Sequence, residues 1–203
     1  MVHDHPASRA RARKVTATIK PDVLALELPP LAIARFTAIA RQPPTAHQRG
    51  GEMTAAIVAA EDARIVGIDG PSLRFLPRLA STVASAHPPI TTIADLCQNL
   101  LLAYRRAVWC RFSRESTGGY KSPNRFETGG DASAQASDER RQMHRARSLS
   151  NSLGAPNRIH LRDAAREQHM VKELSRYVKD GDVVAVVGCD HLEPIATALS
   201  GMR

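Results

Sequence analysis

Aromatic residues are scarce in this sequence, since Phe, Trp and Tyr together make up 4% of its 203 residues. Proteins that bind single-stranded nucleic acid use aromatic side chains as stacking platforms, so this scarcity argues against that class. The formal net charge is nevertheless +8, and basic runs occur at 9–14 and 105–114. Such runs are usually solvated faces, and no recognised nucleic-acid-binding motif accompanies them. We therefore expect nucleic acid not to be the partner.

Cysteines are few and far apart, and no long apolar run is present. Cys97, Cys110 and Cys189 form no C-x-x-C pair, which predicts neither a disulfide framework nor a zinc knuckle. The longest apolar run, 93–104, is interrupted by polar residues and is too short for a bilayer. The first residues lack the apolar stretch of a signal peptide. The sequence thus predicts a cytoplasmic protein without a membrane span.

Several familiar catalytic motifs are also missing. The glycine pair at 50–51 is not followed by Lys-Ser or Lys-Thr, which excludes a P-loop. Neither a G-x-S-x-G elbow nor an H-E-x-x-H motif occurs. A serine or cysteine triad stays open, because its members need not be neighbours in sequence. Any catalytic site must therefore be assembled from residues that are distant along the chain.

Apolar patterning predicts strands that alternate with helices. Nearly continuous apolar runs at 23–28, 64–69 and 183–187 are typical of buried parallel strands. Helical periodicity is present between them, and in the first helix we expect Ala10, Val15 and Ile19 to face the core. The expected helices are 8–19, 31–40, 52–60, 71–85, 91–112, one that includes 166–170, and one that starts near Pro194. This order predicts an α/β fold with a mostly parallel central sheet flanked by helices.

The middle of the chain differs from the rest. Residues 113–158 contain two glycine pairs, many Ser and Asn, and few large apolar groups. A structureless loop of this length is uncommon inside one domain. We therefore expect a single domain over 1–203 whose middle is a polar insertion. This insertion is either a solvated, disordered excursion or carries one polar helix at 137–148.

Polar side chains follow the predicted strands. Glu27 and Asp69 end the first two strands, and His191 follows the third within Gly-Cys-Asp-His at 188–191. Ligands of open parallel sheets bind beyond the carboxyl ends of the strands, so these groups could converge with His3 there. Each residue also has a simpler interpretation. Glu27 could cap the next helix and Asp69 could belong to an ordinary turn. His191 could lie in a surface loop, and His3 in a frayed terminus. Together, imidazoles and carboxylates suit a divalent ion such as zinc, manganese or cobalt.

Four stretches carry a resemblance to a known family. Residues 3–28 place a histidine and a helix before Pro-Asp-Val-Leu-Ala-Leu-Glu-Leu, and 51–69 join Gly-Glu-Met to a strand with an acidic end. Residues 166–170 resemble part of an E-R-D-x-x-M pattern, and 188–191 are an intact G-x-x-H. Jointly they resemble the TraB/PrgY/GumN family, which includes the Tiki-type metalloproteases.

The resemblance covers 3–80 and 160–200, and the chain departs from the family pattern in three ways. The glycine of the first G-x-x-H would precede Met1, which predicts that the chain is incomplete at its start. Ala165 stands where the family usually has glutamate. The apolar helices expected between the second and third stretches are missing from the polar middle.

The resemblance implies a metal-dependent hydrolase that acts on peptides or another small amide. It implies that His3 and His191 bind a divalent ion, with Glu27 as a further ligand or the base. Asp69 would be an additional ligand or lie behind the others, and Arg166 would bind a substrate carboxylate or stabilise an oxyanion. The alternative is a peptide-binding module without turnover, since pheromone-shutdown members of the family are usually described as sequestering peptide signals.

Overall fold

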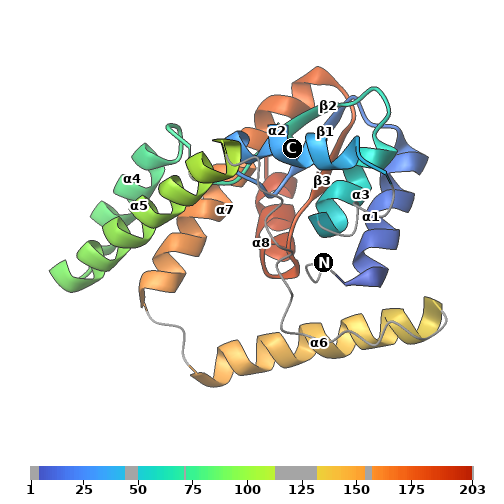
Figure 1. Cartoon of the computed structure of the whole chain (residues 1–203). Coiled ribbons are helices and arrows are strands. Elements are labelled where there is room, and N and C mark those ends of the chain that lie inside the picture. Colours follow the sequence, from blue (N-terminus) through green and yellow to red (C-terminus); the bar gives the residue numbers. More distant parts are fainter. Residues whose placement is uncertain (1–4, 44–49, 71, 113–131, 154–156, 203) are drawn as a thin grey trace.

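The computed structural model describes residues 5–43, 50–70, 72–112, 132–153 and 157–202. Three parallel strands form its central sheet: β1 (Val23–Leu26), β2 (Arg64–Gly67) and β3 (Val183–Val186). The strand order is β2-β1-β3, with helices on both faces (Figure 1). The predicted α/β fold with a parallel sheet flanked by helices is therefore confirmed.

The three strands end level with one another. Leu26 of β1 lies opposite Gly67 of β2 and Val186 of β3. Because all three strands run in the same direction, the residues that follow them leave the sheet at one shared edge. Glu27 and Asp69 are among those residues, so the topology itself assembles the candidate site.

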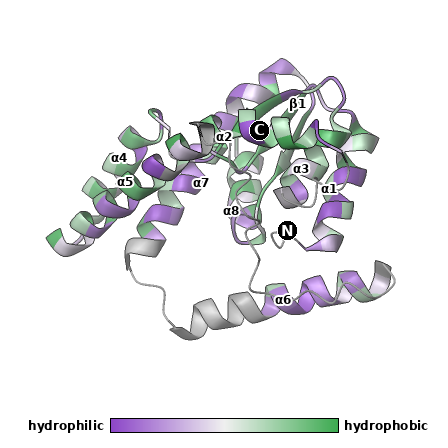
Figure 2. Ribbon diagram, viewed as in Figure 1, coloured by the Kyte–Doolittle hydropathy of each residue, from purple (hydrophilic) through white to green (hydrophobic). Residues whose placement is uncertain are grey.

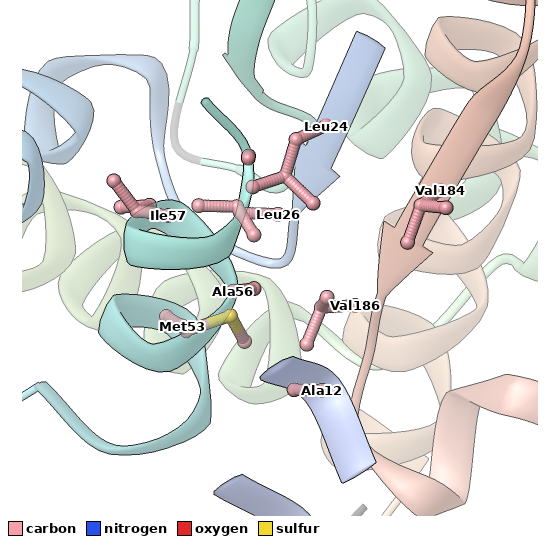
Figure 3. Packing of buried hydrophobic residues seen from close by; sticks show 9 residues of the cluster. Ala12, Leu24, Leu26, Met53, Ala56, Ile57, Val184 and Val186 are labelled. Carbon is pink, nitrogen blue, oxygen red and sulfur yellow. The ribbon is translucent and has the colours of Figure 1, made fainter. Parts of the chain in front are cut away.

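Three helices cover one face of the sheet: α1 (Pro6–Ile19), α2 (Pro30–Ala40) and α3 (Gly51–Ala59). Side chains from the first and third pack directly on those of β1 and β3 (Figure 3). Burial of this apolar surface stabilises the fold at about 25 cal/mol per Å². The buried members are Ala12, Leu24, Leu26, Met53, Ala56, Ile57, Ala60, Val184 and Val186.

The opposite face is covered by α7 (Asn157–Tyr177) and α8 (Cys189–Ser200). The alternate residues of β1, Val23 and Ala25, point to this side and pack against Met170 of α7. A short 3-10 helix, η2 (Val178–Asp180), joins α7 to β3. The central strand is thus buried on both faces, as expected of a nearly continuous apolar run.

Two further helices pack against α7. These are α4 (Leu76–Ala86) and α5 (Ile90–Phe112), and they lie beside α7 in Figure 1. Buried Phe75 and Leu79 pack on Ala165 of α7. None of the helices in the described part of the chain is long and apolar enough to cross a membrane.

The predicted core face of α1 is wrong. Val15 and Ile19 are 37% and 49% exposed, and the buried residues of the helix are Ser8, Ala12 and Thr16. This helix packs along α3, whose buried residues include the small Gly51, Thr54 and Ala56. Small side chains allow two helices to approach closely, so here size rather than hydrophobicity decides which face turns inward.

The last helix begins earlier than predicted. It starts at Cys189, directly after the N-cap residue Gly188, and Pro194 lies inside it. Proline lacks the N–H that would bond to the carbonyl of residue i−4, yet the helix continues through this position. As a consequence His191 lies in the first turn of a helix rather than in a loop. The predicted helix at 71–85 likewise begins later, at Leu76.

The middle of the chain contains α6 (Ala132–Leu153), which is longer than the predicted polar helix at 137–148. The described side chains of α6 are mostly hydrophilic (Figure 2). Its buried Glu139 accepts hydrogen bonds from Ser8 and from Arg11, whose Nη2 lies 2.7 Å from Oε2. The polar-helix alternative is thus confirmed, whereas 113–131 and 154–156 lie outside the described residues.

Candidate functional site

The guanidinium of Arg166 lies at the centre of the candidate site. From α7 it binds Asp69 through two hydrogen bonds, from Nε to Oδ1 and from Nη2 to Oδ2, each 2.9 Å long. The same Nη2 donates to Oε1 of Glu27 at 2.7 Å. The side chains of Arg166 and Glu27 are only 20% and 6% exposed. Charge-assisted bonds with this little solvent are among the stronger ones in proteins.

Backbone contacts hold both acids in place at the sheet edge. The N–H of Glu27 donates to the carbonyl of Val186, and its Oε2 accepts from the N–H of Gly188 at 2.5 Å. The N–H of Asp69 donates to the carbonyl of Leu28 at 3.2 Å. The positions of the carboxylates therefore follow from the strand pairing and do not depend on long flexible loops.

His191 completes the group from the first turn of α8. Its Nε2 lies 3.1 Å from Nη1 of Arg166, and its Nδ1 lies 2.9 Å from Oε1 of Glu167. A guanidinium can only donate, so Nε2 accepts and the proton of a neutral ring resides on Nδ1. Glu167 thereby fixes both the tautomer and the orientation of the imidazole. Below, Arg166, Glu27, Asp69 and His191 are called the Arg166 cluster.

Negative charge exceeds positive charge around Arg166. Burial alone would lower the pKa of Arg166, but hydrogen bonding with Asp69 and the charges of Asp69, Glu27 and Asp163 raise it. The guanidinium therefore remains charged. Among the described residues, the ion pairs of the site involve four carboxylates, those of Glu27, Asp69, Asp163 and Glu167, and two arginines, Arg166 and the half-exposed Arg162. This imbalance favours the binding of a further cation.

Sequence reasoning selected four residues that the fold does bring together: Glu27, Asp69, Arg166 and His191. Their arrangement differs from the one expected, because the arginine lies between the acids and the histidine. His3, the fourth predicted ligand, lies outside the described residues. Sequence reasoning missed Glu167 and Asp163, although both lie on the same helix as Arg166, one and three residues away.

The donor chemistry of the cluster fits a divalent ion in part. Nε2 of His191 and Oε1 of Glu27 lie 3.7 Å apart, a separation that two ligands about 2.0–2.2 Å from one ion can span. The carboxylate behind Nδ1 of His191 is the usual companion of a metal-binding imidazole. Among the residues with described positions, however, no three His, Cys, Asp or Glu side chains are grouped to hold an ion. A third donor would have to come from elsewhere, and the resemblance assigns that role to His3.

One turn beyond Arg166, a second polar residue of α7 lies in the interior. His169 is 1% exposed, and its Nε2 lies 3.3 Å from Oγ of Ser72. Burial lowers the pKa of His169 below its ordinary value of 6.5, although the negative charge of Glu173 opposes this. The ring is therefore neutral near pH 7, and sequence reasoning gave no signal for it.

The lowered pKa of His169 makes stability depend on pH. Below about pH 6.5 the unfolded chain binds a proton at this position more readily than the folded chain, so the free energy of unfolding falls as pH decreases. We expect His169→Gln to lose less stability than the wild type between about pH 7.5 and about pH 5.5. Urea unfolding at the two pH values measures this. The exposed His160→Gln serves as the control, and equal losses in both variants would refute the assignment.

Comparison with known proteins found no matching family model, no matching curated protein and no matching solved structure. The fold and the cluster thus define a parallel α/β protein with a charged site at the carboxyl edge of its sheet. Its assignment to the TraB/PrgY/GumN family stays a prediction based on the sequence stretches described above.

Proposed function

We propose that this protein is a metal-dependent hydrolase of peptides or other small amides, of the TraB/PrgY/GumN type. The observation that carries the proposal is the convergence of Glu27, Asp69 and His191 around Arg166 at the carboxyl edge of the sheet. Ionisable groups that burial and a specific charge partner perturb together, as here around Arg166, are candidates for a functional site. The group also lies where ligands of open parallel sheets bind.

In this proposal His191 and Glu27 hold the ion through Nε2 and Oε1, with His3 as a further ligand. A bound divalent ion would lower the pKa of a water molecule to about 7 and polarise the substrate carbonyl. Glu167 accepts the Nδ1–H of His191 and so orients the ring with Nε2 toward the site. Asp69 and Glu27 engage Nε and Nη2 of Arg166, so that Nη1, freed when His191 binds the ion, would donate to a substrate carboxylate or a developing oxyanion.

The alternative function is peptide binding without turnover. One observation favours it: the lone pairs of Glu27 and His191 that a metal would need are already in contact with Arg166. A peptide carboxylate could exchange with these acceptors on the guanidinium without any metal. Turnover separates the two functions, because only the hydrolase releases shortened products.

The test is a screen of short synthetic peptides, incubated with metal-loaded protein and followed by mass spectrometry. Because Glu27→Gln keeps the shape and one oxygen acceptor but removes the charge, we expect it to reduce cleavage by about 10²–10⁴-fold. Glu61→Gln, at an exposed position away from the sheet edge, should retain the wild-type rate. Cleavage that survives Glu27→Gln, or a screen without any cleavage, would count against the hydrolase.

We also propose that the protein acts in the cytoplasm. Cys97 and Cys189 are free thiols, and an exposed free thiol such as that of Cys97 persists best in a reducing compartment. Cellular fractionation with a tagged full chain would test this proposal.

A further inference from the structure

A cavity of about 730 Å³ runs along the outer edge of β2. All four residues of this strand line it, and successive side chains of a strand point to opposite faces. A cavity that touches every one of them therefore lies at the edge of the sheet rather than over a face. Ile33 of α2, from one face, and Tyr177 of α7, from the other, form its two sides.

The backbone of β2 can offer hydrogen bonds to this cavity. In the described part of the chain β2 pairs with β1 alone, and Arg64 and Ile68 donate their N–H groups toward that neighbour. Since the bonding direction alternates along a strand, Ile65 and Gly67 direct their N–H and C=O groups away from β1. The cavity thus combines an open strand edge with walls from two helices.

One end of the cavity is polar and adjoins the Arg166 cluster. Ser72 and His169 line this end. Ser72 follows Asp69 by three residues, and His169 lies one helical turn after Arg166 on α7. Among the described residues, Nδ1 of the 1%-exposed His169 has no hydrogen-bond partner. A buried polar atom without a partner is costly, and this one belongs to a residue of the cavity lining. The remaining lining is largely apolar, as Ile33, Ile65, Val66 and Tyr104 illustrate.

We propose that an extended peptide binds along β2 as an added strand and fills the cavity with a large apolar side chain. Main-chain bonds to an open sheet edge provide affinity, and a pocket for alternate side chains provides selectivity. This inference rests on the proposed function in that it names the substrate as an extended peptide. The bound peptide would run from the cavity toward Glu27 and Arg166.

The walls of the cavity favour a single peptide chain over a second copy of this protein. β2 is four residues long and recessed between α2 and α7, so the flanking helices of a second copy would collide with them. Arg64 and Arg74 line the cavity with side chains that are 64% and 67% exposed. Each arginine is already ion-paired, Arg64 with Asp180 and Arg74 with Glu173, and Glu173 also lines the cavity, so the charge of the lining selects neither acidic nor basic residues.

The first test uses the whole wild-type protein, stripped of metal, and a fluorescein-labelled peptide Glu-Val-Thr-Phe-Thr-Val-Glu. A series of otherwise identical peptides carries one N-methyl group each, moved along the backbone. We expect methylation of alternate residues to weaken binding by about tenfold and that of the intervening residues to have little effect, because only alternate N–H groups face β2. Fluorescence anisotropy measures this. Equal effects at all positions, or no binding of the unmethylated peptide, would overturn the proposal.

The second test fills the cavity. Leu31→Trp places an indole in the lining, and Leu76→Trp makes the same change on α4 outside the lining. We expect binding to be lost only in the first, with circular dichroism confirming that both variants fold. Should Leu31→Trp fail to fold, the N-methyl series still decides.

His191→Ala separates the two proposals. It should bind the peptide like the wild type, because His191 is not part of the cavity lining. Wild-type protein that binds the peptide but neither takes up metal nor cleaves would refute the hydrolase and leave the added strand standing. If the wild type cleaves peptides but N-methylation shows no alternating effect on binding, the added strand is refuted and the hydrolase is not. Self-association of the protein, abolished by Leu31→Trp, would identify a second copy as the occupant and overturn the proposal.

Discussion

Replacing Arg166 with methionine is expected to lower the free energy of unfolding by about 3–5 kcal/mol. The change keeps much of the side chain's length but removes the guanidinium that Glu27 and Asp69 share. Glu27 and Asp69, whose side chains are 6% and 10% exposed, would be left buried without their shared partner. Urea unfolding followed by circular dichroism measures the loss.

Arg162→Met is the matched control on the same helix. Arg162 is 50% exposed and pairs with Asp163 in solvent, so its removal should change stability by less than about 0.5 kcal/mol. Arg166→Lys should recover only part of the lost stability, because an ammonium cannot form the two parallel bonds to Asp69. Equal free energies of unfolding for Arg166→Met and Arg162→Met would show that Arg166 does not hold the site together.

Gly67→Ala is expected to destabilise the protein by about 2–3 kcal/mol. A Cβ at this position would lie 2.5 Å from the carbonyl oxygen of Leu28 and 2.9 Å from the nitrogen of Pro30. Both are backbone atoms of the segment that follows β1, and they cannot move without shifting Glu27. Metal binding and stability should therefore decline together in this variant.

The control for this change is Gly201→Ala at the end of α8. Its Cβ would meet no atom closer than 3.8 Å, so the substitution should be neutral or slightly stabilising. Thermal unfolding of the two variants gives the comparison. An equally stable Gly67→Ala protein would show that the contact between β2 and the segment after β1 is looser than described.

The edge of the sheet was predictable from sequence because strand ends carry a local signal. Continuous apolar runs ended by Glu27 and Asp69, and a glycine followed by Asp-His after the third run, suffice to locate one edge of a parallel sheet. The proximity of these residues follows from topology and needs no knowledge of side-chain packing. This part of the candidate site is therefore encoded in short stretches of the chain.

The central position of Arg166 was not predictable in the same way. It depends on how α7 is rotated about its axis, which is fixed by Met170 and Leu174 packing on the sheet. His169 and Glu173 are buried on the same helix for that reason, although both are polar. Helical periodicity identifies an apolar stripe, but it does not show which polar neighbours of that stripe will be covered by other elements.

The most direct test of the site is its metal content. Plasma mass spectrometry of purified protein, washed with chelator and reloaded with zinc, manganese or cobalt, should find about one ion per chain in the wild type. The exposed His160→Ala variant should give the same result, and His191→Ala should lose the ion because Nε2 is a predicted ligand. Equal metal content in His191→Ala, or folded wild-type protein that takes up no ion, would contradict a metal-dependent site at the Arg166 cluster.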